Sequence, residues 1–138
     1  MISSIASYYI DELDEWKAAI DLRLEEVNEL EEWLNQILQN NSVTQLAAKV
    51  EHYMNQLLLA AQNLEELREQ LEDAEKPLYK GQAPIENELL TEQSKQHQKE
   101  LRMRLYNLEK EILDIRYHCD EFLGDTITAQ NKKGSNTN

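Results

Sequence analysis

The chain has 138 residues, with 27 acidic and 14 basic side chains and a formal net charge of −13 at pH 7. Its one cysteine excludes an intramolecular disulfide, and no stretch approaches the roughly 20 apolar residues that a membrane-spanning helix needs. Three Gly and two Pro leave little material for turns between strands, so the composition predicts a single all-α domain. A signal peptide begins with basic residues, but no basic residue precedes Lys17 in this sequence. We therefore expect a cytoplasmic protein.

A first helix is predicted over residues 2–40 by a heptad repeat of apolar residues. Residues seven apart lie on one face of a helix that supercoils around a neighbour. Two such series run along this segment: Leu13, Ile20, Val27 and Leu34, and, three residues after each, Trp16, Arg23, Leu30 and Ile37. Arg23 is the one charged member, so the predicted apolar stripe is interrupted once.

A second helix is predicted over residues 43–75. Ser42 and Gln45 have the spacing of a capping box, in which each side chain bonds the backbone N–H of the other residue at a helix start. The stripe that follows is complete: Val43, Val50, Leu57, Leu64 and Leu71, with Leu46, Tyr53, Ala60, Leu67 and Ala74. Because Pro77 lacks a backbone N–H and Gly81 favours a turn, the pattern predicts that this helix ends before Pro77.

A third helix is predicted over residues 85–123, with a clean stripe only in its second half. That stripe is Leu101, Leu105, Leu108, Ile112, Ile115, Cys119 and Phe122. The preceding run, residues 91–100, contains no aliphatic or aromatic side chain. We interpret the run as a stutter, a local shift of the stripe that brings Ser94 and His97 to the core.

The end of the third helix is predicted at Gly124, since glycine commonly terminates helices. Residues 125–138 are too polar to pack and are expected to form a flexible, disordered tail. The short links between the helices favour antiparallel neighbours. We therefore expect an up-down-up three-helix coiled-coil bundle over residues 1–124. A dimer in which two hairpins pair and the third helix extends is the alternative.

The charged residues are unevenly distributed. Residues 1–75 carry the entire net charge of −13, whereas acidic and basic side chains balance over residues 76–138. Lys95, Lys99 and Arg102 give the third helix a basic face, which we interpret as complementary to its acidic neighbours in the bundle. An acidic hairpin repels a phosphate backbone, so contact with nucleic acid is excluded.

A polar layer is predicted inside the bundle. In an antiparallel arrangement Arg23 falls near the weak half of the third helix, so it is expected to lie beside Ser94, His97 or Gln98. A buried polar layer commonly fixes the register of a coiled coil at a cost in stability.

Clusters of carboxylates are the one pattern that points to catalysis. Glu65, Glu66 and Glu69, like Glu25, Glu26 and Glu29, are spaced as in the magnesium sites of all-α nucleotide pyrophosphatases of the MazG type, which they resemble. The resemblance implies metal-dependent hydrolysis of a nucleotide. The alternative is a solvated acidic helix face. The sequence contains no Glu-x-x-His motif, so no di-iron site is expected. Cys119 lies on the apolar stripe and is expected to be an inert core thiol.

Protein binding is the favoured function, because several apolar residues exceed what the stripes need. These residues are Tyr8, Leu22, Trp33, Leu58 and Leu59. Surplus apolar side chains are typical of a partner surface or a dimer. In outline the chain is similar to flagellar and type III export chaperones. We expect a non-enzymatic interaction module that binds a protein partner or a second copy, and no catalytic residue, cofactor, metal or membrane contact.

Overall fold

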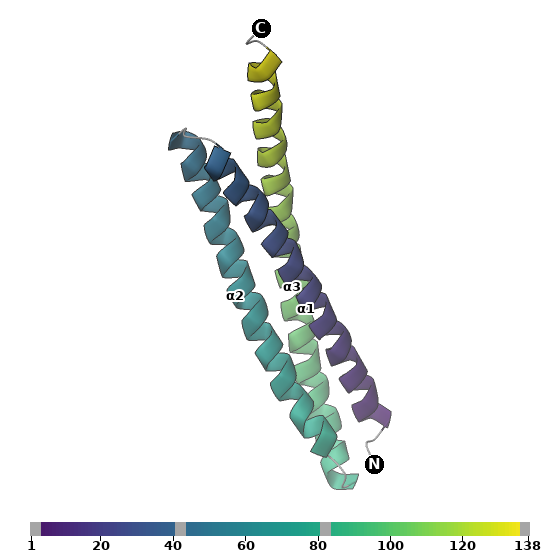
Figure 1. Cartoon of the computed structure of the whole chain (residues 1–138). Helices are drawn as coiled ribbons and strands as arrows, with labels where there is room; N and C mark the ends of the chain where they lie inside the picture. The colour runs from purple at the N-terminus through teal and green to yellow at the C-terminus, as the bar shows by residue number, and fades with distance from the viewer. Residues whose placement is uncertain (1–3, 41–43, 81–83, 136–138) are drawn as a thin grey trace.

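The computed structural model describes residues 4–40, 44–80 and 84–135, which form three helices and no strand (Figure 1). They are α1 (Ser4–Asn40), α2 (Thr44–Lys80) and α3 (Pro84–Ser135). Helices α1 and α2 run antiparallel, and α3 runs in the direction of α1 and packs against both. The predicted all-α, up-down-up architecture is confirmed. No described helix has an apolar segment long enough to cross a membrane.

The heptad positions of all three helices meet in one apolar core. The predicted stripe of each helix faces the other two helices, since a helix covers its apolar side only by packing that side against a neighbour. The largest fully buried side chains are Leu13, Ile20, Leu34, Val50, Leu57, Leu64, Leu67, Leu71, Leu78, Ile112 and Cys119. Burial of an aliphatic side chain of this size contributes about 1.5–3 kcal/mol, so these stripes supply most of the stability.

The predicted end of the second helix before Pro77 is wrong, because α2 continues to Lys80 with Pro77 inside it. The reason is Leu78, which lies seven residues after Leu71 and is 2% exposed. Pro77 is exposed, and so is Asp73, whose carbonyl loses its N–H donor to the proline, so the loss falls on the solvent side of α2. Burial of one more leucine offsets that loss. Gly81, Ser42 and Gln45 are outside the residues whose side chains the structure describes, so the predicted capping box stays a prediction.

The predicted helix end at Gly124 is also wrong, since α3 continues to Ser135. No described glycine has a positive φ, and the Thr126 hydroxyl donates a hydrogen bond to the Phe122 carbonyl at 2.8 Å, as inside a helix. Helix α3 has 52 residues against 37 in each of the others, so its last turns rise beyond the end of the hairpin (Figure 1). The flexibility of the tail stays a prediction.

The predicted stutter in residues 91–100 is wrong as well. Gln98 is buried, with 3% of its surface exposed, and Ser94 is half-buried, whereas His97 is exposed. The buried positions Gln98, Leu101, Leu105 and Leu108 are spaced by three, four and three residues, which is an unshifted heptad repeat. The stripe therefore continues without slipping, and polar residues occupy its first turns.

Leu78 provides a direct test of the extension of α2. Leu78→Ala is expected to lower the free energy of unfolding by about 2–4 kcal/mol, because it leaves a cavity in the core. Tyr79→Ala is the matched control: Tyr79 is 48% exposed, so its loss should cost less than about 1 kcal/mol. Urea unfolding followed by circular dichroism measures both. Equal, small effects would mean that α2 ends before Pro77.

Candidate functional site

The five residues predicted to bind a partner are all exposed on the surface of the bundle. Between 50% and 63% of each side chain is accessible. Tyr8, Leu22 and Trp33 lie on α1, and Leu58 and Leu59 lie on α2. The sequence thus identified residues that the core does not use, but the structure separates them onto two helices. Whether they bind a partner stays a prediction.

A further set of exposed apolar side chains on α3 was missed. They are Met103, Tyr106, Leu113 and Tyr117. The core stripe predicts the third helix, and these four residues lie outside its heptad frame. Their spacing of three, seven and four residues was visible, and it is the spacing of a second helical stripe.

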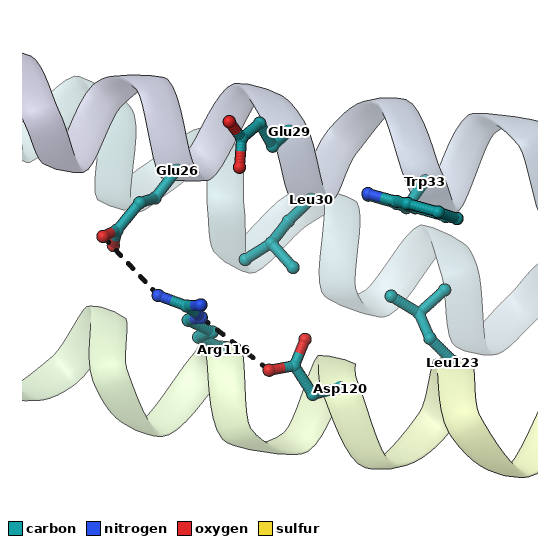
Figure 2. Close-up of a pocket in the computed structure, with 7 residues that line it drawn as sticks. All are labelled: Glu26, Glu29, Leu30, Trp33, Arg116, Asp120 and Leu123. Atoms are coloured by element: carbon teal, nitrogen blue, oxygen red, sulfur yellow. Dashed lines mark ion pairs between the residues drawn. The ribbon is translucent and has the colours of Figure 1, made fainter.

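A groove between α1 and α3 is lined by Trp33, one of the five predicted residues (Figure 2). Its volume is about 270 Å³. Leu30 of α1 and Leu123 of α3 are buried beneath it, and the half-exposed Trp33 ring lies opposite Leu123. Glu26, Glu29 and Asp120 supply carboxylates at its edge. The groove therefore has an apolar floor and a mostly acidic rim.

Arg116 is the cation of this rim. Its guanidinium forms ion pairs with Glu26 of α1 at 3.5 Å and with Asp120 of its own helix at 3.7 Å, as Figure 2 shows. The side chain is about half exposed. An exposed pair of this kind contributes about 0–1 kcal/mol. Arg116 thus fixes the position of two carboxylates at the rim and adds little to stability.

A second depression continues along the same side of the bundle. It is lined by Arg23, Glu26, Tyr106, Glu109, Lys110 and Leu113 and has a volume of about 360 Å³. Glu26 lines both depressions. The two together form what we call the α1–α3 groove, which runs from Tyr106 to Leu123.

A ladder of ion pairs lines the seam between α1 and α3. Glu12 pairs with Arg102 at 2.8 Å, Arg23 with Glu109 at 2.9 Å, and Glu26 with Arg116. With Leu13 and Gln98 at heptad position a, Glu12 and Glu26 occupy g positions of α1, and their α3 partners occupy e positions. The next g and e residues are Trp33 and Leu123. The Trp33 end of the groove therefore begins where the ladder changes from charged to apolar.

The predicted polar layer of Arg23, Ser94 and His97 is not formed. The Arg23 side chain is partly buried and donates hydrogen bonds to Glu109 at 2.9 Å and to Glu26 at 2.7 Å. These acceptors raise the pKa of Arg23, with Glu109 as the largest cause. Glu109 lies four turns beyond Ser94 on α3, so Arg23 is at a different level of the bundle. The prediction was wrong because the Gln98 level of α3 lies beside Tyr9 and Glu12, near the start of α1, and Arg23 lies further along.

Gln98 is the buried polar residue of the core. Its side-chain amide donates to the Tyr9 carbonyl at 3.2 Å and to Glu12 at 3.1 Å. Arg102 bonds the same carboxylate and lies over the Trp16 ring, with 5.6 Å from its guanidinium carbon to the ring centroid. This cluster joins the start of α1 to α3 by hydrogen bonds that require one relative position of the two helices. Gln98 therefore sets the register that was assigned to His97.

The predicted basic face of α3 is only partly used within the bundle. Arg102 pairs with α1, and Arg104, which was not predicted, pairs with Glu66 of α2 at 3.4 Å. Lys95 and Lys99 form no ion pair with any other described residue. On α3, arginines thus provide these ion pairs with the other helices, whereas Lys95 and Lys99 are exposed.

The alternative metal site at Glu65, Glu66 and Glu69 has no supporting geometry. All three side chains are exposed, and Glu66 is paired with Arg104. Over the described ranges, no three His, Cys, Asp or Glu side chains are grouped so that they could hold a metal ion. The cluster therefore has the geometry of a solvated acidic face.

Cys119 lies where the sequence placed it, on the apolar stripe of α3. Its side chain is fully buried, and the rings of Tyr53 and Phe122 lie against each other one turn away, with 5.4 Å between centroids. Burial raises the pKa of the Cys119 thiol from 9.0 to about 11. A thiol that is buried and protonated at neutral pH is a poor nucleophile.

Replacement of Gln98 tests which residue occupies the core. Gln98→Leu is expected to raise the free energy of unfolding by about 0.5–2 kcal/mol, because an apolar side chain of similar size replaces a desolvated amide. The control His97→Leu should change it by less than about 0.5 kcal/mol, since His97 is exposed. Thermal unfolding of both variants measures the effect. A larger increase in the free energy of unfolding for His97→Leu than for Gln98→Leu would mean that His97 occupies the core, as the predicted stutter requires.

The Cys119 thiol predicts a dependence of stability on alkaline pH. Between pH 9.0 and about 11 the unfolded chain loses the thiol proton while the folded chain keeps it. The folded state then holds more protons, so its stability falls as pH rises through this window. Cys119→Ala should show a shallower decline than the wild type in urea unfolding from pH 8 to 11. Parallel pH profiles for the two proteins would contradict the burial of the thiol.

Comparison with known proteins adds nothing to these observations: no family model, curated protein or solved structure matches the chain. We therefore infer function from the surface itself. Its distinctive elements are the α1–α3 groove, the exposed stripe on α3 and the acidic faces of α1 and α2.

Proposed function

We propose that this protein is a non-enzymatic interaction module that binds an amphipathic helix of another protein in the α1–α3 groove. The observation that carries the proposal is the arrangement around Trp33. A half-exposed indole ring faces Leu123 above a floor that includes Leu30. Tryptophan is enriched among the residues that dominate binding energy at protein interfaces.

The charge of the rim specifies the chemistry of the partner. Glu26, Glu29 and Asp120 border the groove, and Arg116 neutralises only part of that charge. The net charge of −13 extends the negative field over α1 and α2. A partner helix with apolar residues on one face and Lys or Arg on its flanks would match both the floor and the rim.

The geometry favours a helix over an extended peptide. The groove lies between two parallel helices, and its floor and walls repeat at heptad intervals. A third surface with the same spacing packs into such a groove with knobs in holes, as in other helix bundles. An extended peptide needs free backbone N–H and C=O groups, which helices do not offer along their sides.

Binding of designed peptides tests the proposal directly. The probes are two helical peptides with the same apolar face, one flanked by Lys and Arg and the other by Glu and Asp. Titration in a Trp16→Phe background, where Trp33 is the only indole, should shift its emission to shorter wavelength with the basic peptide. The acidic peptide should bind at least about tenfold more weakly, and added salt should reduce the difference.

Two variants locate the surface. Trp33→Glu should weaken the basic peptide by about tenfold or more when binding is followed by a label on the peptide. Leu58→Glu combined with Leu59→Glu is the matched control, because these equally exposed residues lie on α2. If the α2 variant loses binding and the Trp33 variant does not, the acidic hairpin binds through α2. Failure of both peptides to bind would reject the proposal.

A further inference from the structure

The outer face of α3 carries a second heptad repeat that stays largely exposed in the part of the chain that the structure describes. Its members are Lys99, Met103, Tyr106, Lys110, Leu113 and Tyr117, spaced by four, three, four, three and four residues. The four apolar members are 57–64% exposed. At about 100° per residue this stripe lies roughly opposite the core stripe of the same helix. Helices α1 and α2 pack on the core side, and α1 approaches the stripe only at the edge of the groove, where Arg23 and Glu26 line a depression with Tyr106, Lys110 and Leu113.

The spacing of this outer stripe indicates another α-helix as its partner. A four-three repeat of large apolar residues is the pattern by which one helix packs along another. A single exposed leucine needs no explanation, but four large residues in register over two heptads form a continuous apolar surface.

The distribution of charge favours a second copy of this chain. Two copies with a net charge of −13 repel each other, but all of that charge lies on residues 1–75. Residues 76–138, which include α3, carry equal numbers of acidic and basic side chains. The outer face of α3 is therefore where two copies can approach with the least repulsion, and each copy offers the same stripe.

The two lysines of the stripe select the orientation. In a parallel pair each residue faces its own copy, so Lys99 would meet Lys99 and Lys110 would meet Lys110. In an antiparallel pair with Met103 opposite Leu113, Lys99 lies opposite Tyr117 and Lys110 opposite Tyr106. Each ammonium then lies against a tyrosine ring, which attracts a cation, instead of against a like charge. Neither lysine is engaged in an ion pair with another residue of the described ranges.

We propose that two copies of this chain form an antiparallel dimer through the outer stripe of α3, with Met103 of each copy opposite Leu113 of the other. The proposal rests on the proposed function, that of an interaction module, and adds a second copy as a partner on an adjoining surface, which shares Tyr106, Lys110 and Leu113 with the lower part of the groove. A twofold axis across α3 makes the interface closed, so the assembly stops at two copies. Trp33 lies beyond the end of the stripe, so the dimer leaves the upper part of the α1–α3 groove accessible.

Sedimentation velocity of the full chain from about 5 to about 500 μM tests the dimer, because a contact of this size is expected to be reversible in that range. The wild type should shift from monomer to dimer as concentration rises. Leu113→Glu should raise the dissociation constant by about tenfold or more, with unchanged circular dichroism, because Leu113 is exposed in the monomer. Leu58→Glu is the control and should dimerise like the wild type. A wild-type monomer at every concentration, or equal effects of the two substitutions, would overturn the proposal.

Disulfide trapping tests the orientation. Met103→Cys and Leu113→Cys are made in separate chains, and the buried Cys119 does not compete. An antiparallel pair predicts that neither variant oxidises to a covalent dimer alone, whereas an equal mixture of the two does. A parallel pair predicts that each variant crosslinks alone, which would overturn the stated orientation.

The tests of the two proposals have separate outcomes. Trp33→Glu should lose the basic peptide and still dimerise, whereas Met103→Glu, at a stripe residue that lines neither depression of the groove, should lose the dimer and still bind the peptide. If the wild type dimerises but binds no peptide, only the groove proposal fails. If it binds the peptide but stays monomeric, only the dimer proposal fails.

Discussion

The packing of heptad stripes against one another is the interaction on which this structure depends. Each helix is apolar along one side, and no helix can cover that side alone. The α1–α2 hairpin buries two stripes against each other but leaves an apolar seam, which the stripe of α3 closes from Gln98 to Phe122. The need to bury every stripe also explains why α2 continues through Pro77, since ending there would expose Leu78.

The surface follows from the same geometry. Positions next to the core stripe face the neighbouring helix, so they carry the ion pairs that align α1 with α3, from Glu12 and Arg102 to Glu26 and Arg116. Where this ladder becomes apolar, the half-exposed Trp33 lies above Leu30 and Leu123 and forms the groove. The arginines Arg102, Arg104 and Arg116 of α3 pair within the bundle, whereas Lys99 and Lys110 lie on the outer stripe. Stability and proposed binding thus use different positions of one repeat.

The sequence predicted the three helices and their topology because apolar periodicity is a local property. It failed where a local rule competed with burial: Pro77 and Gly124 are common helix terminators, yet both lie inside helices. Gln98 was set aside as too polar for the core, because its partners, the Tyr9 carbonyl and Glu12, lie more than 80 residues away in sequence. The exposed residues on α1 and α2 were predictable because they lie outside the apolar stripes. That Trp33 lies opposite Leu123 was not predictable, because the two residues are far apart in sequence and meet only in the folded bundle.

The most direct test of the shared register of α1 and α3 is a pair of distances between spin labels. Together they fix the direction of α3 and its level relative to α1. Labels at Ser7 and Lys95 should lie on adjacent helices at one level, with helix axes about 10 Å apart. Labels at Ser7 and His118 should be separated by a further axial rise of about 35 Å. Pulsed electron resonance in a Cys119→Ala background at low protein concentration should give a short distance for the first pair and a long one for the second. Two long or broad distributions, or a short distance for the second pair, would contradict the shared register.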